Sequence, residues 1–515
     1  MFVRKKSNKS GSTSIQIIDK STGRYKLVKT VGNSKEKRQI EYLWKKAHYE
    51  ISELIGQTEL GLLSKDDQTV LNFLTNNDSI KIRVIGPEEV FGKLFDGIGF
   101  NQIQEELFRY LVITRIVYPG SKLKTVDYIE RYNGIRIDIS KVYRFLDKLN
   151  KQYKKHVEEI SFNHTKEVLK GNISVVFYDI TTLYFEASNE DDLRKVGFSK
   201  DGKAQNPQIL LGLLVGLNGY PIGYEIFEGN KFEGYTFIPV LEKYQKILKL
   251  NKPVIVADAG LLSKENIEIL EEKGYKYILG GKIKNETEYI RRQILNLKLK
   301  DGETAELKRA DDTRLIITYS TKRSKKDQNN RTRGLKRLEK SLLSKKLTKK
   351  QINNRGFNKY LKLIGAVNVE IDYEKFNSDA NWDGLKGYIT NSDLEAKEVI
   401  ENYKNLWQIE KAFRISKTDL KVRPIYHRLR RRIESHICIA FVAYTIYKEL
   451  ERLLKKSKAL FSIQRAIELT QTIYAMELVL PESKMKETIR LSMNEEQKFI
   501  YKAINNEQLL LKVSQ

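Results

Sequence analysis

Three acidic residues occupy positions that suggest a chemical role for their carboxylates. Asp179 lies inside the apolar run VVFYDIT, Asp258 follows the apolar run PVIVA, and Glu410 lies in NLWQIEKAFR. A carboxylate in an apolar strand is costly unless it is paired or binds a cation. A carboxylate cluster that holds two Mg²⁺ ions suits phosphodiester chemistry, because one ion activates the attacking oxygen and the other stabilises the leaving oxygen. The three acids therefore predict metal-dependent cleavage of a phosphodiester.

Each acid also has a purely structural interpretation. Asp179 or Asp258 taken alone can cap a helix or pair with a lysine, and Glu410 taken alone can be an ordinary surface residue of a helix. Glu186 competes for the role of the first acid, but it lies toward the end of its apolar run. The spacing of the acids by itself leaves both interpretations open.

Helical geometry favours a special role for Glu410. At 100° per residue, one narrow helix face carries five residues of this region: Tyr403, Leu406, Glu410, Arg414 and Lys417. A face with this composition is not a core stripe. It is either a salt-bridged surface, with Glu410 bonded to Arg414 at i+4, or a metal ligand flanked by phosphate-binding cations.

Periodicity and turn signals predict the elements that must position these residues. We predict a hairpin over 13–32 and helices over 34–56 and most of 101–170, interrupted at Tyr118-Pro119-Gly120. Strands are predicted at 173–186, at 208–228 (a hairpin turning at Asn218-Gly219), and at 253–257, 275–280, 314–320 and 385–390, with helices at 234–249 and 263–273. A long helix begins with a capping box, Ser392–Glu395, and runs to about Lys417, and the chain is predicted to be helical from 425 onward. Three antiparallel-type strands followed by strand–helix alternation predict a mixed α/β sheet.

One helical pair in the first third has two interpretations. Lys124–Tyr132 and Ser140–Leu149 flank an Asn133-Gly134 turn, which is the layout of a helix-turn-helix. Such a motif would place four residues in a DNA major groove: Ser140, Lys141, Tyr143 and Arg144. Because short helix pairs are common, an ordinary helical pair is slightly favoured.

Composition and charge point to a polyanionic partner. The chain has 515 residues, 93 Lys and Arg against 66 Asp and Glu, and a net charge of +27. That balance suits nucleic acid, although a general basic bias would also produce it. The basic stretch Lys322–Lys350 is either a solvated helix or a DNA-facing insertion, and its one-sided charge favours DNA. The length predicts about two to four domains.

The same composition argues against other classes of protein. The single cysteine, Cys438, can form no internal disulfide, so a reducing cytoplasm is expected. The longest apolar stretch, Ile437–Tyr447, is too short to span a bilayer, so no membrane partner is expected. The first residues lack the apolar run of a signal peptide. With five histidines in the chain, a structural zinc site is not expected, and His436 is assigned to the core.

Several stretches together resemble a known family. They are FYDITTLYFE (177–186), the hairpin ending in FEGN (227–230), VIVADAGLLSKENI (254–267), DGLKGYITN (383–391) and YKNLWQIEKAFRISKTDLKVRPIYHR (403–428). The chain resembles the DDE transposases of bacterial insertion sequences, specifically the IS4-like group and its IS1634 relatives. The combination spans roughly 170–440 and is specific, whereas any single stretch is weak.

The resemblance implies a fold and a domain layout. It implies an RNase H-like catalytic core over 171–283 and 383–424, interrupted by a basic insertion domain over 284–382. A hairpin and a helical DNA-binding region over 1–170 precede the core, and a helical region over 425–515 follows it. The expected fold class is therefore α/β, with a mixed-sheet core and mainly helical flanks.

The resemblance also implies roles for individual residues. Asp179, Asp258 and Glu410 become the catalytic triad that binds two Mg²⁺ ions, with Mn²⁺ as a substitute. The group has a signature of Tyr, Arg, Glu and Lys around its Glu, in which Tyr403, Glu410 and Lys417 keep their places. Leu406 stands where the signature has Arg, and Arg414 on the same face is a candidate replacement.

The expected reaction acts on double-stranded DNA. Metal-activated water cuts a strand at each transposon end, and the freed 3′-OH attacks target DNA in the same site. Phosphate contacts are expected from the signature residues and from a cationic stretch after them: Tyr403, Arg414, Lys417, Arg423, His427 and Arg428, with Arg430, Arg431 and Arg432 extending it. The resemblance further implies a homodimer in the synaptic complex with the terminal inverted repeats, in the nucleoid of a bacterial cytoplasm.

Three other functions remain open at this point. An RNase H-fold nuclease would cut DNA without joining strands, and the carboxylates do not separate it from a transposase. A domesticated, non-catalytic DNA-binding protein would have no need of the three acids. An RNA-binding protein is suggested by charge alone and leaves the acids unexplained.

Overall fold

The computed structural model describes residues 1–55, 65–75, 80–171, 173–248, 252–258, 260, 264–344, 352–353, 356–364 and 368–513. The chain divides into two compact units. The N-terminal unit comprises 1–82 with 476–489, and the main unit comprises 83–475 with 490–515. The ends of two predicted helices, beyond 344 and beyond 248, lie outside the described residues, as do parts of the stretch 254–267.

The N-terminal unit contains a small sheet covered by a helix. Strands β1 (Phe2–Ser7), β2 (Thr13–Asp19) and β3 (Lys26–Ser34) pair antiparallel, and α1 (Lys37–Ile55) packs on them. Ile15 and Ile17 are fully buried beneath Leu43, Ala47 and Ile51 of α1. The predicted hairpin and helix are confirmed, and β1 is a third strand that the sequence did not predict.

Helices form one side of the main unit. They are α3 (Lys93–Ile98), α4 (Glu106–Val117), α5 (Lys122–Tyr128), α6 (Ile139–Lys148), α7 (Lys154–Val168), α15 (Arg430–Lys456), α16 (Ile463–Thr470) and α17 (Glu495–Val513). Helix α15 is the centre of this bundle because its middle is buried on all sides. Within the described part of the chain, no helix has the length and apolar character needed to cross a membrane.

The prediction of helix over the whole C-terminal region is wrong in one place. Strands β15 (Tyr474–Val479) and β16 (Lys486–Arg490) form a hairpin that pairs with β4 (Lys81–Val84), in the order β16-β15-β4. A short α2 (Lys65–Thr75) precedes β4. The alternation YAMELV is too short to separate strand from helix by periodicity, so pairing with a distant strand decides it.

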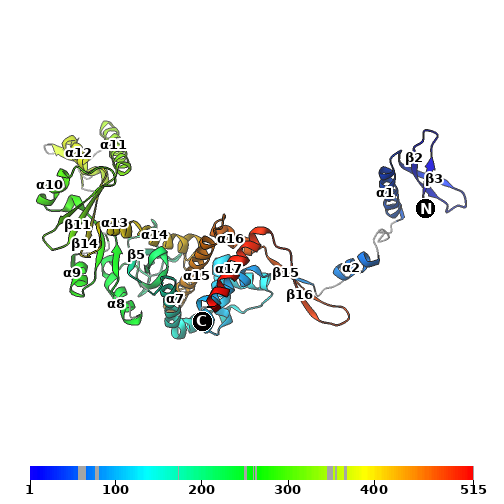
Figure 1. The fold of residues 1–515 in the computed structure, drawn as a ribbon, viewed down its shortest axis with the longest axis horizontal. Helices are drawn as coiled ribbons and strands as arrows, with labels where there is room; N and C mark the ends of the chain where they lie inside the picture. The colour runs from blue at the N-terminus through cyan, green and yellow to red at the C-terminus, as the bar shows by residue number, and fades with distance from the viewer. Residues whose placement is uncertain are drawn as a thin grey trace. The chain divides into compact units, whose positions relative to one another are not determined.

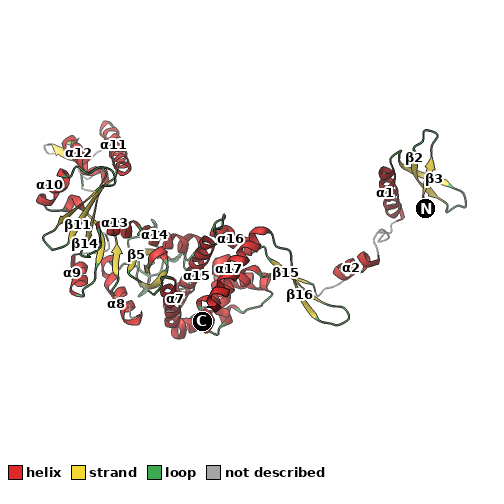
Figure 2. Cartoon of the chain, in the orientation of Figure 1, coloured by secondary structure: helices red, strands yellow, loops and turns green. Residues whose placement is uncertain are grey.

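A mixed sheet forms the other side of the main unit (Figure 2). Its strands are β5 (Val175–Tyr184), β6 (Gln208–Val215), β7 (Pro221–Glu228), β8 (Val254–Ala257), β9 (Tyr277–Gly281), β10 (Thr304–Lys308), β11 (Arg314–Tyr319) and β14 (Leu385–Thr390), in the order β10-β11-β14-β9-β8-β5-β6-β7. Strands β5, β6 and β7 are antiparallel, whereas β8 and β9 run parallel to β5. This is the strand order of an RNase H-like core, and the predicted mixed α/β fold with helical flanks is confirmed.

Different helices pack on the two faces of the sheet. Because side chains alternate along a strand, Val176 and Tyr178 of β5 face α8 (Phe237–Leu248) and α9 (Lys264–Glu272). Phe177 faces the opposite way, into the core shared with α13 (Ala396–Lys404), α14 (Trp407–Arg414) and α15. Figure 1 shows these two sets of helices on opposite faces. Both faces are covered, which explains why β5 is mostly apolar.

The segment between β9 and β14 extends this sheet and adds a small subdomain. Its elements are α10 (Glu288–Asn296), β10, β11, α11 (Thr321–Leu343), β12 (Leu361–Ile364), β13 (Asn368–Ile371) and α12 (Tyr373–Ser378). Strands β10 and β11 join the central sheet through β14, while β12 and β13 pair with each other. Leu338 of α11 packs on Tyr360 and Ile371 to close the small core.

The predicted long helix after β14 is broken, which corrects that prediction. Helix α13 ends at Lys404, α14 begins at Trp407, and one π-helical turn over Ile415–Asp419 follows. The capping box is formed by Glu395 and Glu398 rather than by Ser392. The hydroxyl of Ser392 is buried instead against Thr390, 2.8 Å away. The break lies between Tyr403 and Glu410, so these two residues do not share one regular helical face.

Candidate active site

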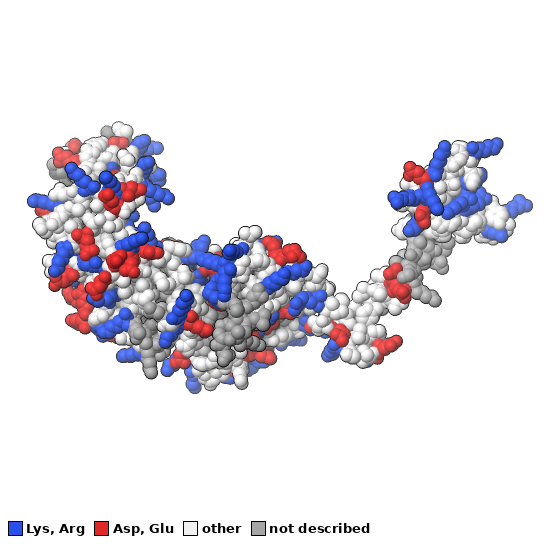
Figure 3. Space-filling model, viewed as in Figure 1, with Lys and Arg blue, Asp and Glu red and all other residues white. Residues whose placement is uncertain are grey.

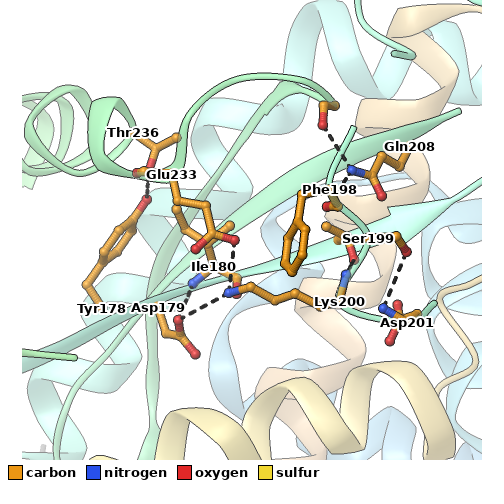
Figure 4. A network of polar contacts seen from close by, with 12 residues as sticks. Tyr178, Asp179, Ile180, Phe198, Ser199, Lys200, Asp201, Gln208, Glu233 and Thr236 are labelled. Atoms are coloured by element: carbon orange, nitrogen blue, oxygen red, sulfur yellow. Dashed lines mark hydrogen bonds and ion pairs between the residues drawn. The ribbon is translucent and has the colours of Figure 1, made fainter. Parts of the chain in front are cut away.

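Asp179 lies in the middle of the central strand β5. It follows the alternation of Phe177, so its carboxylate lies on the face covered by α13 and α14. The backbone N–H of Ile180 donates a 2.7 Å hydrogen bond to Oδ1 of Asp179. The neighbouring Tyr178 lies on the opposite face, where its hydroxyl bonds Thr236 at 3.0 Å (Figure 4).

Asp258 lies directly after β8, the strand next to β5. The parallel register pairs Phe177 with Val256, and continuing it by two residues sets Asp258 beside Asp179. Asp258 is exposed, whereas only a quarter of the Asp179 side chain is accessible. The shorter strand β8 ends opposite the middle of β5, and the register of the two strands brings these two acids together.

Glu410 lies on α14, which covers this face of the sheet, and its side chain is exposed. The phenol of Tyr403 lies near the charges of both Asp258 and Glu410. Burial, together with the nearby carboxylates of Asp258 and Glu410, raises the pKa of the Tyr403 phenol. A Cβ on Gly280 of β9 would lie 2.5 Å from the Tyr403 hydroxyl, so glycine there lets the phenol pack against the strand.

Lys200 and Glu233 belong to the same group of side chains, and the sequence did not single them out. Lys200 lies in the loop between β5 and β6, and Nζ reaches back to donate to the carbonyl of Ile180 at 2.8 Å. The same Nζ lies 3.0 Å from Oε1 of Glu233 and 4.0 Å from Oδ1 of Asp179 (Figure 4). The one available signal was the acid three residues after FEGN, at the exit of β7.

The environment of Asp179 disfavours its charged form. Burial raises the pKa of Asp179 to about 6, the Lys200 ammonium and the Ile180 N–H oppose this rise, and the charges of Glu233 and Asp258 add to it. A buried acid with a raised pKa beside further carboxylates marks a candidate functional site. A bound divalent cation would stabilise the ionised form of such a cluster.

The donor set of this site suits a hard divalent cation. Asp179, Asp258, Glu233 and Glu410 supply carboxylate oxygens, which are the ligands that Mg²⁺ and Mn²⁺ prefer. In the described part of the chain, no three His, Cys, Asp or Glu side chains approach closely enough to hold a metal ion. The chemistry of the donors fits the cation, and the register sets Asp179 of β5 beside Asp258, which directly follows the neighbouring strand β8.

The predicted phosphate-binding cations are divided between two environments. Lys417 and Arg423 both pair with Asp201 of the β5–β6 loop, Lys417 at 3.2 Å. Burial lowers the pKa of Lys417, and Asp201 opposes that effect. Arg414 and Arg428 are exposed. Asp201 was not predicted from the sequence, because nothing local connects it with residues more than 200 positions away.

His427 is partly buried near other cations, and Arg431 and Arg432 have acidic partners within the chain. Burial and the charges of Lys122 and Arg115 lower the pKa of His427 to about 3. Arg431 and Arg432 both pair with Asp147 of α6, at 2.8 and 2.9 Å. This part of the cationic stretch therefore also ties α15 to the helical region before the sheet.

Comparisons with known proteins assign part of this chain to a family. Residues 170–446 match the family model described as a transposase DDE domain. A cryo-EM structure of the piggyBac transposase synaptic complex with hairpin DNA is similar at 9% identity, over 75% of this chain and 76% of that chain, with a TM-score of 0.37. The Mos1 transposase paired-end complex with the left transposon end is similar at 10% identity, over 45% of this chain and 71% of that chain, with a TM-score of 0.16. A crystal structure of the Mos1 mariner paired-end complex with Mn is similar at 9% identity, over 45% of this chain and 72% of that chain, with a TM-score of 0.15. Comparison with curated proteins gives no match.

Proposed function

The chain belongs to the DDE transposase family, whose domain covers residues 170–446, and from this premise we propose that it cuts and joins DNA. The single observation that carries the proposal is the position of Asp179 and Asp258. Asp179 lies in the middle of β5 and Asp258 directly follows the parallel strand β8. The strand register sets the two beside each other, on the face covered by the helix that carries Glu410. The proposed substrates are the terminal inverted repeats of an insertion sequence and a target duplex.

Each residue of the site has a proposed role. Asp179, Asp258 and Glu410 hold Mg²⁺, or Mn²⁺ in its place. Bound there, the metal supplies charge stabilisation for attack on a phosphodiester and for the leaving oxygen. Tyr403 orients Asp258, and Lys200 holds Asp179 and Glu233 in place through its contacts with both.

The surrounding cations are proposed to bind the DNA backbone. Arg414 and Arg428 are exposed and would contact phosphates, as would Lys417, Arg423 and His427 once DNA competes for their present contacts. Such contacts position the duplex without reading its sequence. We further propose that the insertion 284–382 faces DNA through α11, that two copies act together on paired ends, and that the chain belongs to the IS4-like group with its IS1634 relatives.

Cleavage of a labelled transposon-end duplex in Mg²⁺ tests the proposed metal site. Asp258→Asn keeps the shape of the side chain and removes the ligand charge, so the variant should bind the duplex like wild type. Its cleavage rate should fall at least about 100-fold, which corresponds to about 2.7 kcal/mol of lost transition-state stabilisation. Asp393→Asn is the matched control, since that side chain is 97% exposed and lies after β14. If Asp258→Asn cleaves the duplex as fast as wild type does, the assignment of Asp258 as a metal ligand is wrong.

A strand-transfer assay separates the transposase from a nuclease of the same fold. A pre-cleaved end with a free 3′-OH is offered together with a supercoiled target plasmid. The proposal expects covalent joining that needs Mg²⁺ and is lost in Asp258→Asn. Cleavage without joining by the wild type would establish the nuclease alternative instead.

A further inference from the structure

A large cavity of about 980 Å³ lies apart from the carboxylate site. Its wall is made by the end of α4, the loop into α5 with the start of that helix, the segment 418–427, and one residue each of α6, α15 and α16. None of Asp179, Asp258 and Glu410 lines it. We call it the α4–α5 pocket, and its wall has an unusual surplus of positive charge.

Arg115 is the most deeply placed cation of the α4–α5 pocket. It is 4% exposed, and its Nη1 makes only long contacts, 3.4 Å each, to the carbonyls of Leu420 and Lys421. Its Nε has no partner within the described structure. Burial lowers the pKa of this guanidinium to about 10. A guanidinium with five donors is normally buried only against a carboxylate or a phosphate.

Lys122 lies beside Arg115 and is equally buried. It is 5% exposed, and among the described residues it has no hydrogen bond or ion pair. Burial, and then the charge of Arg115, lower its pKa well below the ordinary value. It also occupies the first turn of α5, where the helix dipole disfavours a cation. Its position therefore costs stability, and local structure does not explain it.

Two histidines, which are neutral near pH 7, complete the wall beside these cations. The rings of His427 and His436 lie 5.5 Å apart. His436 is 6% exposed, and its Nε2 contacts the carbonyl of Val422 at 2.9 Å, while Nδ1 has no partner within the described structure. The pocket does contain one acid, Asp419, but its carboxylate accepts a hydrogen bond from Tyr447 at 3.1 Å.

We propose that the α4–α5 pocket binds a phosphate group, held by Arg115, Lys122, His427 and His436. A phosphate supplies the negative charge and the acceptor oxygens that these four side chains lack. Charge-assisted hydrogen bonds from Arg and Lys to such oxygens are about twice as strong as neutral ones. The phosphate can belong to a DNA backbone or be a free ion. The inference rests on the buried cations and does not depend on the proposed cleavage chemistry.

Binding of inorganic phosphate to the full chain tests the proposal. Thermal unfolding and calorimetric titration are run with phosphate against chloride at equal ionic strength. Wild type should gain thermal stability with phosphate, and Lys122→Met should lose at least tenfold in affinity. Without phosphate, Lys122→Met should unfold at a higher temperature than wild type, because it removes a buried unpaired charge and keeps most of the side-chain volume. Lys122→Gln repeats the test with a polar side chain, and Lys308→Met, at a 78% exposed position, is the control.

A second binding experiment, with duplex DNA, identifies the source of the phosphate. If the pocket takes a backbone phosphate, Lys122→Met weakens duplex binding and inorganic phosphate competes with the duplex for wild type. If it takes a free ion, phosphate binding is lost in the variant while duplex affinity equals that of wild type. The proposal is overturned if phosphate stabilises wild type no more than chloride does and Lys122→Met binds duplex normally.

Discussion

The carboxylate of Asp179 is placed where its charge is costly, and this has a measurable consequence. Burial raises its pKa to about 6 although Lys200 lies nearby. An acid whose pKa is higher in the folded than in the unfolded state binds more protons when folded. Its contribution to stability is therefore present at low pH and is lost as the pH rises from about 3.8 to about 6. A site in which several carboxylates lie together to bind a cation loses this stability when no cation is bound.

We predict that Asp179→Asn stabilises the metal-free protein at neutral pH while abolishing cleavage. The shift in pKa sets an upper limit of about 3 kcal/mol on the gain at pH 7.5, and partial exposure reduces it. At pH 4 the two proteins should be nearly equally stable, since Asp179 is then protonated in wild type. Urea unfolding in EDTA at the two pH values measures this, with Asp393→Asn as control. A less stable Asn variant at pH 7.5 would show that Lys200 outweighs burial.

At the scale of elements, the position of Glu410 depends on how α14 is attached to α15. Lys411 of α14 and Lys448 of α15 both pair with Glu451 of α15. Glu451 and Lys448 are nearly fully buried, at 6% and 4% exposure. Burial alone would raise the pKa of Glu451, but the hydrogen bonds from the two lysines outweigh it and lower the pKa. One carboxylate thus joins the two helices beside the catalytic candidate.

Removal of that carboxylate should loosen α14. Glu451→Gln leaves Lys448 buried without its partner, and we expect a loss of about 3–5 kcal/mol in the free energy of unfolding. In wild type the stabilisation from Glu451 is present above the pKa of an unfolded Glu, about 4.3, and is lost as the pH falls through the lower folded value. Chemical denaturation from pH 7 to pH 3 measures both effects. Glu468→Gln, at a 59% exposed position, should change nothing. Equal stability of the Glu451 variant would show that the pair is not coupled.

The contact between β9 and α13 allows a second test at this scale. Gly280→Ala places a methyl group 2.5 Å from the Tyr403 hydroxyl, so we expect overpacking to cost about 1–3 kcal/mol and to displace Tyr403 from Asp258. Adding Tyr403→Phe removes the clashing oxygen and should restore part of the stability without restoring cleavage. Thermal unfolding and duplex cleavage of the single and double variants measure the two effects. Gly97→Ala, where no atom lies within 4 Å of the new methyl group, is the control.

At the scale of the whole molecule, positive charge is concentrated in two segments. Residues 1–56 carry 13 Lys and Arg against five Asp and Glu, and α11 carries nine against two. Figure 3 shows Lys and Arg gathered over the region of α11. Salt-dependent binding to phosphates is the contribution that such segments can make, because each neutralised phosphate releases counterions.

We predict that α11 contributes directly to the salt dependence of DNA binding. Replacing four of its exposed cations by glutamine, Lys322, Lys325, Lys326 and Arg333, should lower the slope of log affinity against log salt concentration by up to about 3.6. Fluorescence anisotropy with a duplex at several salt concentrations measures the slope. Thermal stability should stay that of wild type, because these side chains are exposed. An unchanged slope would show that α11 does not face the duplex.

The sequence by itself determined the strands of the core, its charge and the candidate acids. Strands β5, β6, β7 and β8 are apolar runs or a hairpin with an Asn-Gly turn, and such runs are typical of strands that are buried on both faces. Asp179 and Asp258 were conspicuous because a carboxylate within or at the end of such a run is costly. These features depend on neighbouring residues, so local sequence is enough to predict them.

Only the tertiary structure decided which distant side chains share a site. Lys200, Asp201 and Glu233 reach the acids and the cations through loops whose paths no local pattern specifies. The break between α13 and α14 places Tyr403 against β9, although the periodicity of the sequence continues through it. The α4–α5 pocket likewise gathers Arg115, Lys122 and two histidines from four segments. Charges separated by tens or hundreds of residues meet only when helices and strands pack, and packing follows from the buried surfaces of the whole chain.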